Sequence, residues 1–281
     1  MDLAQRVFEW AQSEPLVNAL VLIGSRARKP EDVVWRPDQH SDWDFQIITS
    51  QPENFTRRGW AEQLGLPLQV FTVRRAAIGG VPKAAALFEG AEADFVIAPL
   101  ELLDRMRRWI ASGEYRHSTE VVRTLQDLAV VIRPGWRFLK GREEWEPFYQ
   151  KVIAEIPDPR LTDAQVLHLA NGFVCDWVWT RRKLERGELI AAQRMLHRSL
   201  AETNLQLLHE LRLRRGERSF PEGRRAELIL PPAERSSVQI DANLERASLE
   251  SALEHAASTC RTFTVALVGD SWHWPCLSPE A

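Results

Sequence analysis

The first hundred residues alternate between segments with helical spacing of apolar side chains and short β-rich runs. Residues 2–13 carry apolar side chains at helical spacing, and the apolar run at 16–24 predicts a buried strand that ends at Gly24. The same criteria predict a strand at 43–49, a helix at 53–65, and short strands at 67–73 and 92–98. This mixture is typical of an α/β domain.

After about residue 110 the β-rich runs fade and helical spacing continues. Helices are predicted at 99–114, 119–132, 162–186, 189–215 and 242–268. A chain of 281 residues is long enough for two modest domains. The predicted fold is therefore an α/β (α+β) domain with a mixed sheet at 1–112, followed by an all-α domain at 113–281.

Composition narrows the classes of partner. The chain has 36 basic and 39 acidic residues, a formal charge of −3, which argues against a general nucleic-acid binder. Three scattered cysteines are too few for a disulfide framework or a zinc site. The N-terminus does not resemble a secretory signal, and no apolar run approaches the roughly 20 residues that span a bilayer. We expect a soluble, cytoplasmic protein without a membrane partner.

Two aspartates stand at the start of the second predicted strand. Asp42 and Asp44 flank one tryptophan, and alternate strand residues point to the same face. Two carboxylates placed in this way can bind two divalent cations, and Mg²⁺ prefers such oxygen ligands. The alternative is that these residues only cap and solvate the end of a strand.

A Gly-Ser pair ends the first predicted strand and favours the metal interpretation. Gly24 lets the backbone approach a phosphate closely, and a helix after Ser25 would direct free N–H groups toward it. The Ser25 hydroxyl is a further phosphate donor. Arg26 is the preferred basic residue because it is closest to the turn. The connecting loop carries three more basic residues, which are Arg28, Lys29 and Arg36.

A third acid lies in the strand predicted at 92–98. Asp94 faces into an apolar strand, where a carboxylate without a partner is unfavourable. If this strand neighbours the one that carries Asp42 and Asp44, the three acids converge and need a cation. Asp94 is then a metal ligand or the general base for an attacking hydroxyl. Glu89 and Glu92 are rivals for that role, and Glu89 is also a candidate contact of the substrate.

These residues together resemble a known superfamily. The Gly-Ser turn, the spacer, "SDWD" and the later strand aspartate resemble the nucleotidyltransferase signature of the DNA-polymerase-β-like superfamily, over roughly residues 17–110. More narrowly, "LIGSRA", the long spacer and "LFEGAEADFVIAPLELL" resemble the aminoglycoside 6-adenylyltransferases that inactivate streptomycin. "RRKLERGEL" also resembles a basic helix segment of that family.

The resemblance implies a fold, a reaction and roles for residues. It implies a nucleotidyltransferase domain of the five-strand type, a helical domain, and a substrate cleft between them. The implied reaction transfers AMP from Mg-ATP to a drug hydroxyl and releases pyrophosphate. Ser25 would hold the triphosphate, Asp42 and Asp44 the metals, and Asp94 the third acidic position. The spacer with Trp35, Pro37 and His40 follows no pattern of the family.

The helical half contributes a basic helix face. Arg181, Arg182 and Lys183 could reach the β- and γ-phosphates, and the family's segment favours Arg182. The alternative for each of them is a solvated helix face with Arg–Glu pairs.

An acid and two tryptophans precede these basic residues. Asp176 lies among apolar neighbours, so it binds either a cationic group of the substrate or a nearby arginine. Trp177 and Trp179 could stack on a sugar or on adenine, although large aromatic residues on a helix more often pack in a core.

The leading hypothesis is a Mg²⁺-dependent enzyme that adenylylates a small cationic antibiotic, an aminoglycoside. A second hypothesis keeps the chemistry and changes the acceptor to a lincosamide or to a partner protein, as in small antitoxins of the superfamily. A third is a nucleotide-binding homologue without catalysis, against which the three intact acids argue. The drug, the preferred nucleotide and the oligomeric state do not follow from the sequence.

Overall fold

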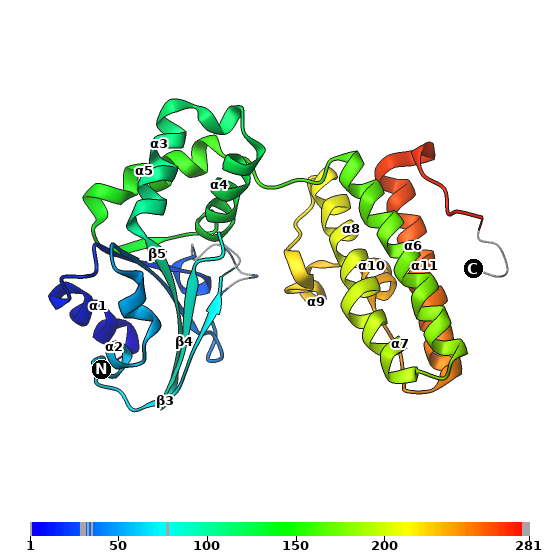
Figure 1. Ribbon diagram of the computed structural model, residues 1–281, viewed down its shortest axis with the longest axis horizontal. Coiled ribbons are helices and arrows are strands. Elements are labelled where there is room, and N and C mark those ends of the chain that lie inside the picture. The colour runs from blue at the N-terminus through cyan, green and yellow to red at the C-terminus, as the bar shows by residue number, and fades with distance from the viewer. Residues whose placement is uncertain (1, 29–31, 33, 35, 77–78, 277–281) are drawn as a thin grey trace. The chain divides into compact units, whose positions relative to one another are not determined.

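The structure, a computed structural model, describes residues 2–28, 32, 34, 36–76 and 79–276 (Figure 1). The chain divides into two compact units, residues 1–159 and 160–281. The first unit is a mixed α/β assembly and the second is helical, which is the fold class that the sequence predicts. The division lies C-terminal to the predicted boundary at 112/113.

Six strands form one mixed sheet in the N-terminal unit. They are β1 (Ala19–Ile23), β2 (Trp43–Thr49), β3 (Leu68–Arg75), β4 (Pro82–Phe88), β5 (Ala91–Pro99) and β6 (Arg137–Lys140). Their order across the sheet is β3-β4-β5-β2-β1-β6. β2 and β5 pair in parallel, while the other neighbouring strands pair antiparallel. The parallel pair at the centre carries Asp44 and Asp94.

Helices cover both faces of this sheet (Figure 1). They are α1 (Leu3–Ser13), α2 (Gly59–Glu62), α3 (Leu100–Ser112), α4 (Thr119–Ile132) and α5 (Arg142–Glu155). Alternation along β2 separates two cores: Ile48 packs with α3, α4 and α5, whereas Phe45 and Ile47 pack with α1 and α2.

The position of the unit boundary follows from the first of these cores. Leu125 of α4 and Tyr149 of α5 are buried in the same core as Val21 and Ile48 of the sheet. The Tyr149 hydroxyl also donates a hydrogen bond to the Gln46 side chain on β2, and burial raises the pKa of Tyr149. Because α4 and α5 cover a sheet face that would otherwise be exposed, they belong to the N-terminal unit rather than to the helical one.

Several elements differ from the sequence-based expectation. The helix predicted at 53–65 is a 3₁₀ turn, Pro52–Thr56, followed by the short α2, because the backbone at Arg57 is extended. The Trp60 indole N–H donates to the Phe55 carbonyl across this break. β4, β6 and α5 were not predicted, since β4 is rich in alanine and α5 contains Pro147.

The C-terminal unit consists of helices around a main core and a smaller buried cluster of Ala170, Val174 and Trp272. The helices are α6 (Asp163–Glu185), α7 (Leu189–Met195), α8 (Ala201–Arg214), α9 (Ala226–Ile229), α10 (Pro232–Val238) and α11 (Arg246–Val268). A π-helical turn, Leu196–Leu200, joins α7 to α8, so the helix predicted at 189–215 is continuous but not uniform. The N-cap Thr162 and Gln165 form a reciprocal capping box at the start of α6.

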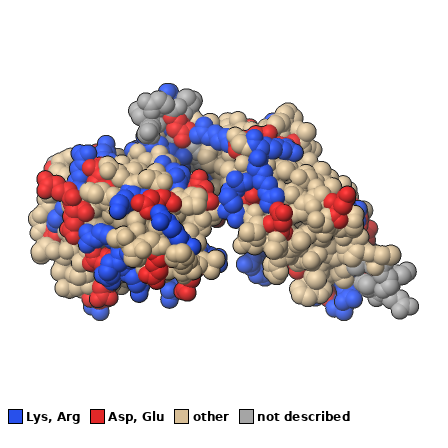
Figure 2. Space-filling model, turned by 90° about the horizontal axis from the view of Figure 1, so that it is seen from above, with Lys and Arg blue, Asp and Glu red and all other residues tan. Residues whose placement is uncertain are grey.

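Charged side chains are interspersed on the surface. In the face shown in Figure 2, Lys and Arg side chains lie among Asp and Glu side chains, as a near-neutral composition predicts. Among the helices that the structure describes, none combines the length and apolar character needed to cross a lipid bilayer.

A buried carboxylate joins the start of the C-terminal unit to α8. The Glu210 side chain is 3% exposed and accepts hydrogen bonds from Arg160, the Leu161 N–H and Arg214. Burial raises the pKa of Glu210, but these hydrogen bonds outweigh burial and hold the pKa below its usual range.

We expect Glu210→Gln to lower the free energy of unfolding of this unit by about 3 kcal/mol at neutral pH, because two arginines lose a buried anionic partner. The wild-type carboxylate stabilises the fold above its unfolded pKa of about 4.3, and this contribution is lost as the pH falls through the lower folded value. Hydrogen exchange of peptides from 160–281, measured at pH 7 and below pH 4, tests both points. Glu185→Gln, which removes an exposed pair with Arg181, is the matched control and should change little.

Candidate active site

The parallel pairing of β2 and β5 brings two of the predicted acids side by side. Asp44 lies directly opposite Asp94 in the register, and Asp42 precedes Asp44 by two residues, which gives all three the same sheet face. One carboxylate oxygen from each residue lies within 4.8 Å of the others. We call Asp42, Asp44 and Asp94 the aspartate triad. Its members are half-buried, and such a group of like charges is favourable only with a cation.

Gly24 adjoins the aspartate triad from the next strand. β1 pairs antiparallel with β2 so that Ile23 lies opposite Asp44, and the chain turns at Gly24 with φ +71°. A Cβ atom built on Gly24 would lie 2.0 Å from Asp44 Oδ2 and 2.8 Å from Asp44 Cβ. The Asp44 side chain therefore occupies space that any side chain at position 24 would fill.

The residues after Gly24 form a 3₁₀ turn, Ser25–Ala27, where the sequence predicted a helix. The turn is short because Arg28 is already extended. The first N–H groups of such a turn have no partner within it, as at the start of a longer helix. The Ser25 hydroxyl is buried and makes no hydrogen bond with the residues that the structure describes. A buried hydroxyl without a partner is unfavourable, so this atom indicates a site for a hydrogen-bonding ligand.

Arg26 contacts the chain itself rather than an open site. Its Nε donates to the Asp42 carbonyl at 3.0 Å and its Nη2 to the Ser41 carbonyl at 2.6 Å. The guanidinium also lies 4.3 Å from the centre of the Trp43 ring. Arg26 therefore holds the segment that carries Asp42, and its predicted contact with the nucleotide stays a prediction.

Arg28 and Arg36, two other basic residues of the loop, differ in their surroundings. Arg28 lies 3.6 Å from Asp32 in an ion pair, and Arg36 is exposed. Lys29 and Trp35 lie outside the described residues.

A basic residue that the sequence did not reveal contacts the aspartate triad. Lys83 of β4 forms an ion pair with Asp94 through its Nζ and the Asp94 Oδ2. The register places Ala85 opposite Asp94 and Lys83 opposite Val96, so the lysine shares the sheet face of the triad. Only recognition of 82–88 as a strand would have indicated this contact.

The two rival acids are outside the triad. Glu89 is exposed in the turn between β4 and β5, where its N–H donates to the Pro67 carbonyl. Glu92 is exposed on β5, two residues before Asp94. Their positions at the start of β5 leave them exposed, and the assignment of Glu89 to substrate binding stays a prediction.

The predicted residues of the helical half belong to the other unit. The Asp176 carboxylate accepts a hydrogen bond from the Ser199 hydroxyl of the π-helical turn. Trp177 is buried in the core, where it packs edge-on against Trp274 at 5.6 Å between ring centres, so packing rather than stacking on a ligand describes it here. Trp179 is 55% exposed.

The basic residues at the end of α6 are surface groups. Lys183 Nζ lies 2.6 Å from Glu188 Oε2. This hydrogen bond is the main reason why the pKa of Glu188 is below its usual range, and the positive charges of Lys183 and Arg186 contribute less. Arg181 pairs with Glu185 at 3.3 Å, and Arg182 is exposed. The predicted phosphate contacts of Arg182 and Lys183 stay predictions.

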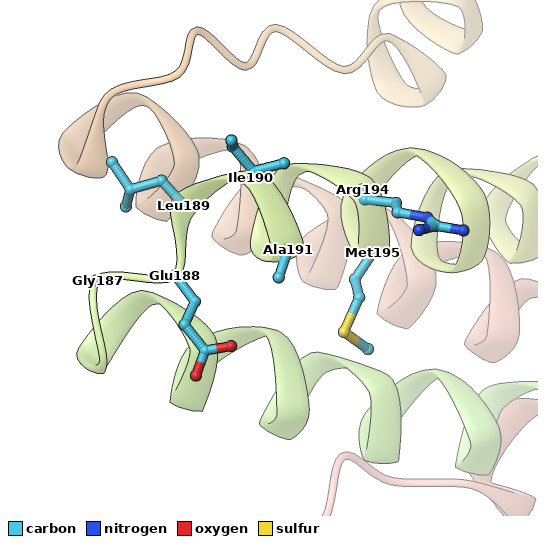
Figure 3. Close-up of a pocket in the computed structure, with 7 residues that line it drawn as sticks. All are labelled: Gly187, Glu188, Leu189, Ile190, Ala191, Arg194 and Met195. Carbon is cyan, nitrogen blue, oxygen red and sulfur yellow. The ribbon is translucent and has the colours of Figure 1, made fainter.

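A hollow in the C-terminal unit lies beside α7. Figure 3 shows Glu188, Ala191 and Met195 pointing to one side of α7, while Ile190 points away. The hollow is lined mainly by apolar side chains and is formed by Gly187, Glu188, Leu189, Ile190, Ala191, Arg194 and Met195. None of the residues predicted for the site lines this hollow, although Glu188, the partner of Lys183, does.

Comparison with known proteins gives distant structural likenesses. No family model and no curated protein matches the chain. It is similar to an aminoglycoside 6-adenyltransferase from Bacillus subtilis with 13% identity and a TM-score of 0.40, over 97% of this chain and 92% of that one. It is also similar to a nucleotidyltransferase-like protein from Exiguobacterium sibiricum with 12% identity and a TM-score of 0.34, over 94% and 74% of the two chains. At these values the likenesses assign neither a substrate nor a site residue to this chain.

Proposed function

We propose that the chain is a metal-dependent nucleotidyltransferase that transfers AMP from Mg-ATP to a hydroxyl group of an aminoglycoside such as streptomycin. The proposal rests on the aspartate triad, whose carboxylate oxygens lie within 4.8 Å of one another beside Gly24. It rests also on the buried Ser25 hydroxyl, which has no partner among the described residues. A group of acids that could hold a cation thus adjoins a hydroxyl that could donate to a phosphate, and a metal-bound triphosphate requires this combination.

The residues present fit magnesium. Three carboxylates supply the hard oxygen ligands that Mg²⁺ prefers, and Gly24 leaves room for the Asp44 carboxylate among them. Asp42, Asp44 and Asp94 would hold two ions, whose charge would stabilise the negative charge that develops during phosphoryl transfer.

The protein side chains then have separate tasks. The Ser25 hydroxyl donates to a phosphate oxygen, and Arg26 fixes the backbone of Asp42. The acceptor oxygen forms a bond to the α-phosphorus while the bond between this phosphorus and the bridging oxygen breaks, and pyrophosphate leaves with the electron pair. Asp94 takes the proton from the acceptor hydroxyl as the general base.

The acceptor class comes from the resemblance of the sequence motifs to the aminoglycoside enzymes. The exposed carboxylates of Glu89 and Glu92 support a cationic acceptor, because they place negative charge on the turn and strand that lead to Asp94. Arg182, Lys183 and Asp176 enter this proposal as further candidates, without a contact that assigns them a ligand.

A panel of acceptors tests the proposal. The purified chain is incubated with Mg²⁺, each of the four nucleoside triphosphates, and aminoglycosides or lincosamides, and mass spectrometry detects any added nucleotide. We expect AMP on an aminoglycoside, with release of pyrophosphate. Modification of a lincosamide would change the acceptor, and ATP binding without pyrophosphate release for any acceptor would contradict catalysis.

Ser25→Ala tests the phosphate contact. We expect the KM for ATP to rise about tenfold, because a hydrogen bond to a charged phosphate is lost. The melting temperature should stay the same or rise, since the wild-type hydroxyl is buried without a partner. Steady-state kinetics and thermal unfolding measure the two effects, and a fall in melting temperature with an unchanged KM would show a structural role instead.

A further inference from the structure

Lys83 provides a positive charge to one member of the aspartate triad. Its Nζ contacts Asp94 Oδ2, and the two side chains are 34% and 15% exposed. The contact spans two neighbouring strands, because Lys83 lies one position further along the sheet face than Ala85, the partner of Asp94. The ion pair is therefore partly shielded from water and stronger than one on an open surface.

This ion pair concerns the same carboxylate that the proposed function assigns to the metal. A divalent cation that uses all three aspartates approaches a site where an ammonium group already neutralises one of them. The nearby guanidinium of Arg26 is engaged differently, because its hydrogen bonds go to the carbonyl groups of Ser41 and Asp42. Lys83 thus competes directly with a cation for Asp94.

We propose that Lys83 is an exchangeable counter-ion: it pairs with Asp94 before the nucleotide binds and moves to the triphosphate when Mg-ATP binds. This inference rests on the proposed function. An ammonium group on a flexible four-carbon side chain can change partners by rotation, whereas a planar guanidinium is suited to a fixed geometry. Free metal then binds weakly, and metal with nucleotide binds well, because the nucleotide supplies both the cation and new anionic oxygens for Lys83.

Lys83→Met should move two affinities in opposite directions. Without nucleotide, we expect Mn²⁺ to bind about tenfold more tightly, because the competing charge is gone. With Mn²⁺ present, we expect ATP to bind about tenfold more weakly, because the ammonium no longer contacts the phosphates. Electron paramagnetic resonance of free Mn²⁺ gives the first affinity, and isothermal titration with a non-hydrolysable ATP analogue gives the second.

Two variants control for charge and for position. Arg74→Gln removes an exposed positive charge on β3 directly opposite Lys83, one strand further from Asp94, and should change either affinity less than about twofold. Lys83→Arg keeps the charge and should retain the weak binding of free Mn²⁺.

Other outcomes overturn the inference. An unchanged or lower Mn²⁺ affinity in Lys83→Met would show that the lysine only orients Asp94. Crystals of the wild-type chain soaked with Mn²⁺ test the same point without a variant: Lys83 should leave Asp94, and an ammonium still bound to it beside the metal refutes the exchange. If the wild-type chain binds no Mn²⁺ at the aspartate triad and transfers no nucleotide, the proposed function fails together with this inference. If the wild-type chain transfers a nucleotide but Lys83→Met leaves the Mn²⁺ affinity unchanged, only the inference about Lys83 fails.

Discussion

Replacing Asp44 by asparagine is expected to lower the kcat for AMP transfer by at least about a hundredfold, because removal of one preorganised electrostatic contact at a reacting phosphate has about this effect. Asp44 lies opposite Asp94 and against Gly24, so its carboxylate lies between the other acids and the glycine turn. The amide has nearly the same shape as the carboxylate, and the fold should stay intact. Pyrophosphate release and circular dichroism measure the two expectations.

Glu92→Gln is the matched control for this loss of charge. Glu92 lies on the strand of Asp94, is exposed, and is outside the group of carboxylates within 4.8 Å of one another. We expect its kcat to stay within about threefold of the wild-type value, since an exposed carboxylate interacts weakly. If Glu92→Gln lost as much activity as Asp44→Asn, the general base would have to be reassigned from Asp94.

Gly24→Ala is expected to be nearly as damaging to activity, although it adds only one methyl group. The new Cβ would lie 2.0 Å from Asp44 Oδ2 and 2.7 Å from Asp44 Cγ, so the Asp44 side chain must move. We expect a loss of kcat of at least about a hundredfold, as for removal of the carboxylate. The strained backbone should also lower the free energy of unfolding by about 1–3 kcal/mol. Kinetics, Mn²⁺ binding and thermal unfolding measure these effects.

Gly269→Ala separates the strain from the collision. Gly269 has φ 59° and ψ −140°, close to the φ 71° and ψ −158° of Gly24, and no atom lies within 4 Å of its virtual Cβ. This variant should therefore lose stability and keep both activity and Mn²⁺ affinity. Full activity in Gly24→Ala would show that Asp44 can shift without cost, which would contradict the proposed metal site.

Hydrophobic patterning predicted the elements that carry the aspartate triad. β2 has the predicted bounds 43–49, and β5 extends the predicted strand at 92–98 by one residue at each end. β2 is rich in β-branched and aromatic residues, β5 contains the run Phe95–Ile97, and both strands are largely buried, so local preference and tertiary packing agree there. The sequence could also predict that acids in two such strands meet, provided that the strands are neighbours.

The contact of Lys83 could not be predicted in the same way. Its strand, β4, contains three consecutive alanines, which favour helices over strands when taken alone. Pairing with β3 and β5 on both sides stabilises the strand in spite of this composition. Tertiary hydrogen bonding thus overrides local preference, and the ion pair with Asp94 depends on a register that the sequence does not display.

Residue type alone also did not determine which partner a side chain contacts. The position of Arg26 after the glycine turn predicts a contact with phosphates, but it gives no sign of the hydrogen bonds that Arg26 donates to the carbonyls of Ser41 and Asp42. Trp177 could have been a ligand contact or a core residue, and its burial beside Trp274 decides for the core. In both cases the deciding neighbour is distant along the chain, and periodicity contains no information about it.

The pairing of β2 with β5 limits how such a protein can change its length. Because side chains alternate between the two faces of a strand, deleting one residue of β2 after Asp44 would turn Asp42 and Asp44 toward the layer now filled by Phe45 and Ile47. Insertions and deletions in homologous chains should therefore be rare in the two central strands and frequent between Ala27 and Ser41. The hydrogen bonds from Arg26 to the carbonyls of Ser41 and Asp42 join the two ends of this connection.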